Sequence, residues 1–536
     1  MTTGTVEILL LMLAVLAAAA VVAQRLKTAP SIILMIAGIG MALVPGLPTI
    51  TLAPEIVLLV ILPPLIYSAG VAMSWREFRF NLRPITLLAF GCVVFTTCAV
   101  AAVAHYVLKF EWAVGFVLGA IVAPPDVVAP LAIARRLGLP RRLLVILEGE
   151  GLANDATALV LYRFAVAAAA TGSFSLPTAS STFAMIVVGE IFYGIAVGWL
   201  SLRLRQWAHE PRVEITLSLM TPYLAFWVPE HLGGSGVLAT VACGLYVSWN
   251  GPRLISSATR LQGIFFWDLL VYLIEGLVFL MTGSQARALF DQVQAFSIRE
   301  LAIATAWTTL VIVIARFVWI FPATYIPRWV SPSLARRDPS PPWQSPFLLS
   351  FIGVRGVVSL AAALAIPFAL NNGQPFPHRE LILFITFGVI IITLVGQGLM
   401  LPLVVRWLGI ACFAEEERSI ELQSELEARI SALETVEKRL ERFIEERELP
   451  DEVITLLRTR NQSRRQILPS NLADGLSYTR QSAALKKELI NAERDFIYQL
   501  LRDGKITDEA RRRIEYELDL EEASVANRGR EGGGWM

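Results

Sequence analysis

The chain has 536 residues, of which 55% are hydrophobic and only 17% are charged, and its mean hydropathy is +0.59. A soluble protein carries about 25% charged residues, so this composition excludes a wholly soluble enzyme and indicates a membrane protein. The net charge of +1 gives no overall field that would attract nucleic acid.

The charged residues are distributed unevenly along the chain. Residues 1–410 form nearly continuous apolar blocks, and residues 411–536 are dense in Glu, Arg and Lys. We therefore expect a transmembrane domain over 1–410 and a helical cytoplasmic tail over 411–536. The first apolar block has no basic leader and is followed by Arg25, so we expect it to be a retained span.

The apolar region divides into candidate transmembrane helices, each of which needs about 20 apolar residues. There are thirteen, near residues 5–23, 30–46, 53–71, 84–107, 112–135, 142–168, 181–203, 213–230, 234–250, 264–288, 300–323, 346–369 and 380–408. The expected fold class is an all-α polytopic membrane protein.

The loops between these spans fix an orientation. One set of alternate loops holds seventeen Lys and Arg residues, and the other set holds four. Basic loops face the cytoplasm. The sequence therefore predicts an inner-membrane protein with its N-terminus outside and its tail inside, which requires an odd number of spans.

Thirteen spans can be read as two inverted six-helix repeats joined by a connecting seventh span. Secondary transporters are often built from such repeats. Counting alone leaves coincidence open, because any odd number of spans can be divided in this way.

The fifth span of each repeat is expected to be interrupted. Pro124, Pro125 and Pro130 flank Asp126, and three prolines in seven residues cannot lie in a regular helix. The twelfth span, which is the fifth of the second repeat, has a weaker interruption at Gly353 and Gly356. A matched pair of interrupted helices points to a transport site, although two kinked packing helices are an alternative.

Ionisable residues inside a membrane are costly and are functional by default. The candidates are Asp126, Glu150, Asp155, Arg163, Glu190, Glu275, Arg316 and Arg355. Asp126, Asp155 and Arg355 lie nearest the centres of their spans, so they are expected at similar depth.

The sixth span carries the residues expected to bind the transported ion. Asp155 shares a helix face with Gly151, which leaves space beside its carboxylate. The carboxylates of Asp155 and Asp126, the Asn154 amide and the Pro125 carbonyl are hard oxygen ligands that suit a monovalent metal cation such as Na⁺. A buried carboxylate must be neutralised, and either a cation or a proton can do this. We therefore expect Asp155 to carry both in turn.

The remaining charges have structural interpretations. Glu150 is expected to pair with Arg355 and join the two repeats. Arg163 and Arg316 are expected to be snorkelling or interhelical arginines, and Glu190 and Glu275 to satisfy neighbouring helices.

At these residues the chain resembles the Na⁺/H⁺ exchanger superfamily, in particular its bacterial NhaP-type branch. The similar segments are Leu62–Gly70, the Pro-Pro-Asp break, Glu150 with Asn154-Asp155, and Gly353–Val358. The resemblance implies thirteen helices with crossed broken helices, a homodimer and elevator-like alternating access. It also implies electroneutral exchange through Asp155, with Asp126 as a second ligand and Glu150–Arg355 as the structural pair.

Two positions depart from the family pattern. The family often has Ser where this chain has Gly151, and Thr where it has Pro125, so the preferred cation stays open among Na⁺, K⁺, Li⁺ and Rb⁺. The expected partners are this cation, H⁺, membrane lipid and a second copy of the chain, with no cofactor and no nucleic acid.

The tail has helical periodicity and no nucleotide or catalytic motif. Its apolar positions over 426–444 fit either a coiled-coil seam or a packing face. Thr507 is the expected N-cap of the last helix.

Functions other than cation exchange would each need a feature of their own. A proton-coupled solute symporter would need a larger polar cavity, and a cation channel would need a filter repeated by symmetry. A membrane-bound enzyme would need a nucleophile–base pair or metal-ligand spacing, and the sequence has neither.

Overall fold

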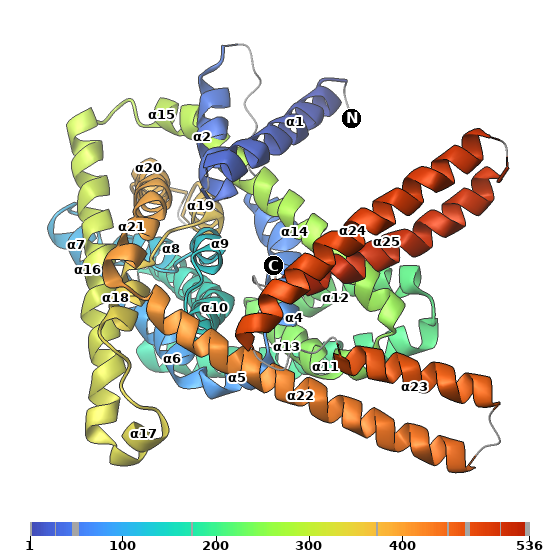
Figure 1. Ribbon diagram of the computed structural model, residues 1–536. Coiled ribbons are helices and arrows are strands. Elements are labelled where there is room, and N and C mark those ends of the chain that lie inside the picture. The colour runs from blue at the N-terminus through green and yellow to red at the C-terminus, as the bar shows by residue number, and fades with distance from the viewer. Residues whose placement is uncertain are drawn as a thin grey trace. The chain divides into compact units, whose positions relative to one another are not determined.

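The chain divides into two compact units, Met1–Ala411 and Cys412–Met536. The computed structural model describes residues 3–26, 28–45, 53–172, 175–370, 373–446, 450–466, 472–503 and 505–530. In these residues the regular elements are helices (Figure 1).

The described residues include seven helical segments that are long and apolar enough to cross a membrane. They are Glu7–Leu26, Pro54–Ala72, Leu82–Tyr106, Leu176–Ala208, Ser257–Gln292, Ile298–Val330 and Arg379–Leu408. Two shorter apolar helices, Pro30–Leu43 and Trp112–Val122, accompany them. The expectation of an all-α polytopic membrane protein is confirmed.

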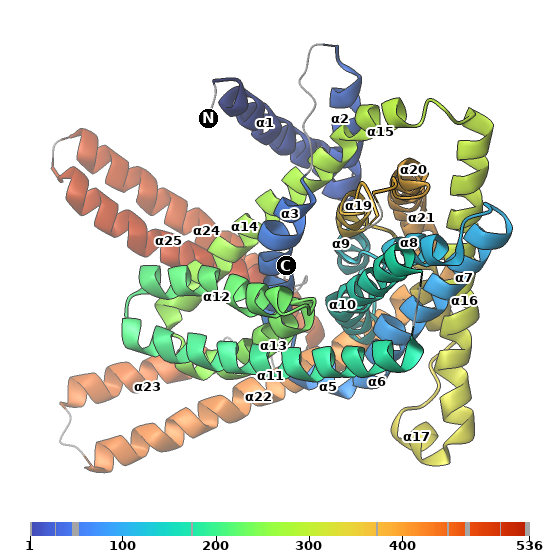
Figure 2. The same ribbon diagram turned by 180° about the vertical axis from the view of Figure 1, so that it is seen from behind.

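The first unit contains two helical bundles (Figures 1 and 2). In the first bundle, α11 packs on α12 and α13, α13 on α4, and α14 on α1 and α2. Its helices are α1 (Thr3–Leu26), α2 (Pro30–Leu43), α4 (Leu62–Ala72, preceded by α3, Pro54–Ile56, and the π-helical turn η1, Val57–Ile61), α11 (Leu176–Ala208), α12 (Pro211–His231), α13 (Val237–Leu254) and α14 (Ser257–Ser284).

In the second bundle, α8 packs on α7 and α10, and α16 packs on α7, α18 and α20. Its helices are α6 (Leu82–Thr86), η2 (Leu87–Cys92), α7 (Val93–Tyr106), α8 (Trp112–Val122), α9 (Val128–Arg136), α10 (Arg141–Thr171), α16 (Ile298–Val330), α18 (Gln344–Phe351), α19 (Val357–Leu364), α20 (Arg379–Ile391), η3 (Ile392–Gln397) and α21 (Gly398–Leu408). Short helices α5 (Trp75–Phe80), α15 (Ala286–Gln292) and α17 (Pro332–Arg337) lie in the connections.

Both predicted interruptions are present. Residues 123–127 separate α8 from α9, and residues 352–356 separate α18 from α19. The first break follows from Pro124 and Pro125, which have no amide donor and clash with preceding carbonyls. At the second break, glycines at 353 and 356 allow the backbone to approach other groups closely.

The second unit consists of four helices: α22 (Ala411–Glu446), α23 (Asp451–Gln466), α24 (Leu472–Arg502) and α25 (Asp508–Arg530). Ion pairs of Arg458 with Glu441 and of Arg465 with Glu437 join α22 to α23. Arg494 joins α24 to α25. Thr507 Oγ1 accepts a hydrogen bond from Ala510 N at 3.2 Å, which confirms the predicted cap.

The close contact between α2 and α14 depends on glycine. A Cβ atom at Gly283 would lie 2.3 Å from the Met35 carbonyl oxygen, and one at Gly38 would lie 2.2 Å from the Leu280 carbonyl oxygen. Small residues allow the backbones of two membrane helices to come this close. In a membrane, helix association is driven by van der Waals packing and not by the hydrophobic effect, so such close contact stabilises the pair.

Gly283→Val should force α2 and α14 apart and lower the free energy of unfolding by about 1–3 kcal/mol. The measurement is the thermal unfolding midpoint of purified protein in detergent. Gly40→Val is the matched control, since Gly40 is on α2 and a Cβ atom there meets nothing within 4 Å. Equal losses in both variants would contradict this explanation.

Candidate functional site

The two interrupted segments are hydrogen-bonded to each other. The amide of Asp126 donates to the Val354 carbonyl at 2.7 Å. This bond joins two residues that are far apart in sequence, at the point where each of the two segments is not helical. The site is built around this junction.

Arg355 occupies the junction and is fully buried. Its Nε donates to the Val122 carbonyl at 2.6 Å, and its Nη2 donates to the Ala123 carbonyl at 3.2 Å. Its Nη1 donates to the carbonyl of Gly353. The guanidinium therefore satisfies carbonyls that the breaks release, and its charge faces the negative C-terminal end of α8.

Asp126 lies at the N-terminal end of helix α9, whereas Arg355 lies at the C-terminal end of α8. Its Oδ1 accepts a hydrogen bond from Val128 N at 2.9 Å, at the start of α9. The positive end of a helix stabilises a carboxylate charge. Gly356 lies directly against this side chain, because a Cβ atom at 356 would come within 1.9 Å of Asp126 Oδ2.

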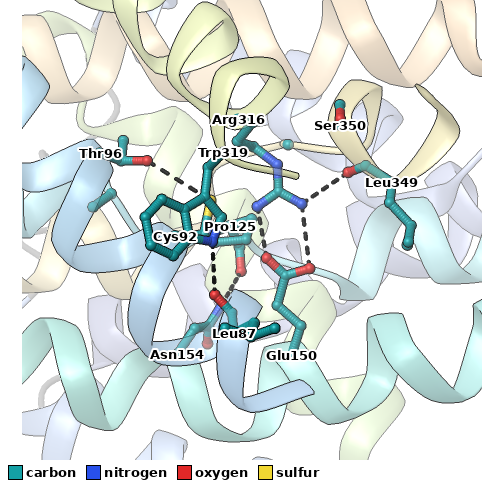
Figure 3. Close-up of polar contacts among 12 residues, drawn as sticks. Leu87, Cys92, Thr96, Pro125, Glu150, Asn154, Arg316, Trp319, Leu349 and Ser350 are labelled. Atoms are coloured by element: carbon teal, nitrogen blue, oxygen red, sulfur yellow. Dashed lines mark hydrogen bonds and ion pairs between the residues drawn. The ribbon is translucent and has the colours of Figure 1, made fainter. Parts of the chain in front are cut away.

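Helix α10 brings Asn154 and Asp155 to the first break. Asn154 is fully buried, and its Nδ2 donates to the Pro125 carbonyl at 2.6 Å (Figure 3). Its Oδ1 is buried without a hydrogen-bond partner among the described residues. A buried acceptor in this condition is costly unless something else donates to it or coordinates it.

Asp155 is a partly buried residue, and within the described part of the chain its carboxylate has no hydrogen bond or ion pair. It lies close enough to Asp126 for the two carboxylates to repel each other. The space beside Gly151 is filled by Val127, whose Cγ2 would lie 2.2 Å from a Cβ atom at 151. The structure thus brings together Asp126, Asn154, Asp155 and the Pro125 carbonyl.

The predicted Glu150–Arg355 pair is wrong. Glu150 instead accepts two hydrogen bonds from Arg316 of α16, Nη1 to Oε1 at 2.6 Å and Nη2 to Oε2 at 3.2 Å (Figure 3). Arg316 Nη2 also donates to the Leu349 carbonyl at 2.9 Å, at the end of α18. The physical reason is that backbone carbonyls already occupy the Arg355 guanidinium.

Sequence reasoning missed the role of two residues. Arg316 was expected only as a general interhelical arginine, but it neutralises Glu150. Thr393 was not considered, and its Oγ1 accepts the Arg355 amide hydrogen at 2.9 Å. Nothing in a single sequence distinguishes a buried threonine from any other threonine. An arginine in the middle of an apolar span, in contrast, can be recognised from the sequence as a residue that needs a partner.

The other membrane charges lie outside the junction. Glu190 accepts from the amides of Ser235, Gly236 and Leu238 at the start of α13, which confirms that it satisfies a neighbouring helix. Arg163 pairs with Glu230 at the end of α12. Glu275, on α14 of the first bundle, lies within electrostatic range of Asp126 and of Arg135.

Two interrupted helices that meet beside carboxylates inside a helical membrane protein define a secondary transporter. Residues 10–407 match the family described as sodium/hydrogen exchanger, transmembrane. The chain belongs to this sodium/hydrogen exchanger family. As a member, it exchanges cations for protons and is not an enzyme.

Relatives support the same assignment. An uncharacterized Na⁺/H⁺ exchanger of Mycobacterium tuberculosis is 32% identical over 534 residues, which cover 97% of this chain and 96% of the relative. A sodium, potassium, lithium and rubidium/H⁺ antiporter of Bacillus pumilus is 34% identical over 378 residues, which cover 68% of this chain and 56% of the relative.

A solved structure has a similar fold. The sodium proton antiporter MjNhaP1 from Methanocaldococcus jannaschii matches with a TM-score of 0.62 at 18% identity, over 75% of this chain and 98% of that one. The predicted similarity to NhaP-type antiporters is confirmed.

The pairing of Glu150 with Arg316 leads to a stability prediction. Glu150→Leu or Arg316→Met alone leaves a buried charge unpaired, which costs about 3–5 kcal/mol. The double variant should recover much of this loss, measured as the unfolding midpoint in detergent. Glu150→Leu combined with Arg355→Met should recover less, because Arg355 contacts carbonyls rather than Glu150. Additive losses for Glu150 and Arg316 would contradict the pairing.

Proposed function

We propose that the protein exchanges one monovalent cation for one proton, with Asp155 as the carrier of both. The observation that carries this proposal is the Asp155 carboxylate, which has no partner in the described residues. It lies close to a second carboxylate, beside the point where the two interrupted segments are hydrogen-bonded to each other. The charge of Asp155 must be neutralised when its surroundings exclude water. A proton and a cation compete for this position.

The proposed cation ligands are hard oxygens. They are the carboxylates of Asp155 and Asp126, the free Oδ1 of Asn154, and the Pro125 carbonyl, which also accepts from Asn154. This donor set suits Na⁺, Li⁺ or K⁺ rather than a soft metal. Na⁺ is favoured, and the Bacillus pumilus relative, named for four alkali cations, supports testing K⁺, Li⁺ and Rb⁺ as well.

We also propose the arrangement that makes alternating access possible. The protein has thirteen spans that form two inverted six-helix repeats joined by a connecting span. It lies in the inner membrane with its N-terminus outside and its tail in the cytoplasm. The second bundle, which carries the site, moves against the first, and two copies associate as a homodimer. The separation of the described helices into two bundles is consistent with such movement.

The proposed exchange of a cation for a proton would allow the protein to contribute to pH homeostasis of the cell. Proton uptake or release at Asp155 is coupled to a cation gradient, so the direction of transport depends on the two gradients together. The domain assignment, with transport over 1–410 and the tail over 411–536, belongs to the same proposal.

Asp155→Asn should abolish exchange while leaving the protein in the membrane, because an amide neither releases a proton nor carries the charge that binds a cation. The measurement is dequenching of a pH-sensitive dye in inverted vesicles after addition of Na⁺, K⁺ or Li⁺. Glu148→Gln, the same chemical change on α10 at a residue paired with Arg135, is the matched control and should retain exchange. Cation-dependent proton flux in Asp155→Asn would refute the carrier assignment.

Exchange should be electroneutral, because Asp155 binds either one proton or one cation. Asp126 is expected to remain a fixed charge, since Val128 N and the α9 N-terminus stabilise its carboxylate. In liposomes containing purified protein, a pH gradient should drive cation uptake, and a membrane potential at constant pH should not. Uptake driven by potential would place Asp126 in the proton path.

A further inference from the structure

Three arginines surround one carboxylate at one end of the second bundle. Asp338, which follows α17, pairs with Arg142 at 2.7 Å and with Arg328 at 2.6 Å. Arg83 lies 3.9 Å from the same carboxylate. These four residues, here named the Asp338 cluster, connect the starts of α6 and α10 to the end of α16.

The charges of the Asp338 cluster do not balance. Three guanidinium groups face one carboxylate, so the cluster carries an excess charge of about +2. Its other hydrogen bonds go to neutral oxygens, those of Asn81 Oδ1 and the Asp338 and Thr324 carbonyls. Arg83 is repelled by both other arginines. This arrangement favours binding of an additional anion.

The cluster is accessible, but only in part. The side chain of Arg83 is 30% exposed and that of Arg142 is 34% exposed, whereas Arg328 is 7% exposed. Arg83 has no contact with Asp338 closer than 3.9 Å, so most of its donors are available. Arginine presents paired donors that match the oxygens of a phosphate group.

Exposed aromatic side chains accompany these arginines. Phe80 is 69% exposed, with the Arg142 guanidinium 5.9 Å from its ring centre, and Trp329 at the end of α16 is 90% exposed. Helices α5, α6 and α17 lie toward the same end of the bundle in both views (Figures 1 and 2). Aromatic and basic side chains together are typical of the headgroup level of a membrane.

We propose that the Asp338 cluster binds a phosphoryl oxyanion, namely the headgroup phosphate of an anionic phospholipid. The exposed Phe80 and Trp329 favour a lipid over a free phosphate ion, because acyl chains can cover them. In the proposed orientation the lipid belongs to the cytoplasmic leaflet, where anionic lipids attract basic residues. The bound headgroup would hold the connection that leads into α18, one of the interrupted helices.

The test measures thermal unfolding of the purified full chain in a neutral detergent, titrated with phosphatidylglycerol or with phosphatidylcholine. Phosphatidylglycerol should stabilise the protein saturably and phosphatidylcholine should not. Arg83→Gln keeps both closer arginine pairs of Asp338, and it should lower the apparent affinity for phosphatidylglycerol about fivefold. Arg253→Gln, at an exposed arginine near the end of α13, is the control and should leave this affinity unchanged.

A second variant separates a lipid site from a purely structural cluster. Asp338→Asn should lower the unfolding midpoint in phosphatidylcholine but increase the gain from phosphatidylglycerol, since it removes the one negative charge. Equal phosphatidylglycerol affinity for the wild type and Arg83→Gln would overturn the proposal. Equal stabilisation by inorganic phosphate would overturn the assignment to lipid.

Discussion

The arrangement of the site depends on the backbone groups released where two helices break inside a membrane. No water is available there to satisfy a free carbonyl or amide, and each unsatisfied group costs several kcal/mol. The two breaks satisfy each other in part, through the bond from Asp126 N to the Val354 carbonyl. Arg355 satisfies three further carbonyls, and its charge faces the end of α8.

The hydrogen bonds of Arg355 to backbone carbonyls explain why Glu150 pairs with a different arginine. A guanidinium that donates to the carbonyls of Val122, Ala123 and Gly353 has three of its five N–H donors engaged and is held at the breaks, and Glu150 pairs with another cation. Arg316 of α16 supplies it and also reaches the end of α18. Gly353 allows both arginines to pass, since a Cβ atom there would lie 2.9 Å from Arg316 Cδ and 3.1 Å from Arg355 Nη1. One glycine thus accommodates two buried charges.

The sequence was sufficient to predict the interrupted helices, because the proline chemistry at 124–130 is local. It was also sufficient to predict that Asp155 and Asp126 lie at similar depth, because each is near the centre of its apolar span. It could not identify the partner of Glu150. Arg316 and Arg355 are equivalent as charges in a sequence, and only the hydrogen bonds in the structure show that Arg355 is already engaged by backbone carbonyls.

The charge balance of the junction connects this architecture to exchange. Asp126, Asp155 and Glu150 carry three negative charges, and Arg316 and Arg355 carry two positive ones. Glu275 belongs to the first bundle and Arg135 is paired with Glu148, so neither is counted among these five charges. The junction therefore lacks one positive charge when Asp155 is ionised. A single proton or a single monovalent cation restores neutrality, whereas a divalent cation would leave an excess. Because burial favours a neutral junction, the second bundle of the proposed exchanger should move most easily when Asp155 carries either a proton or a cation, and this requirement would couple the transport of the two ions.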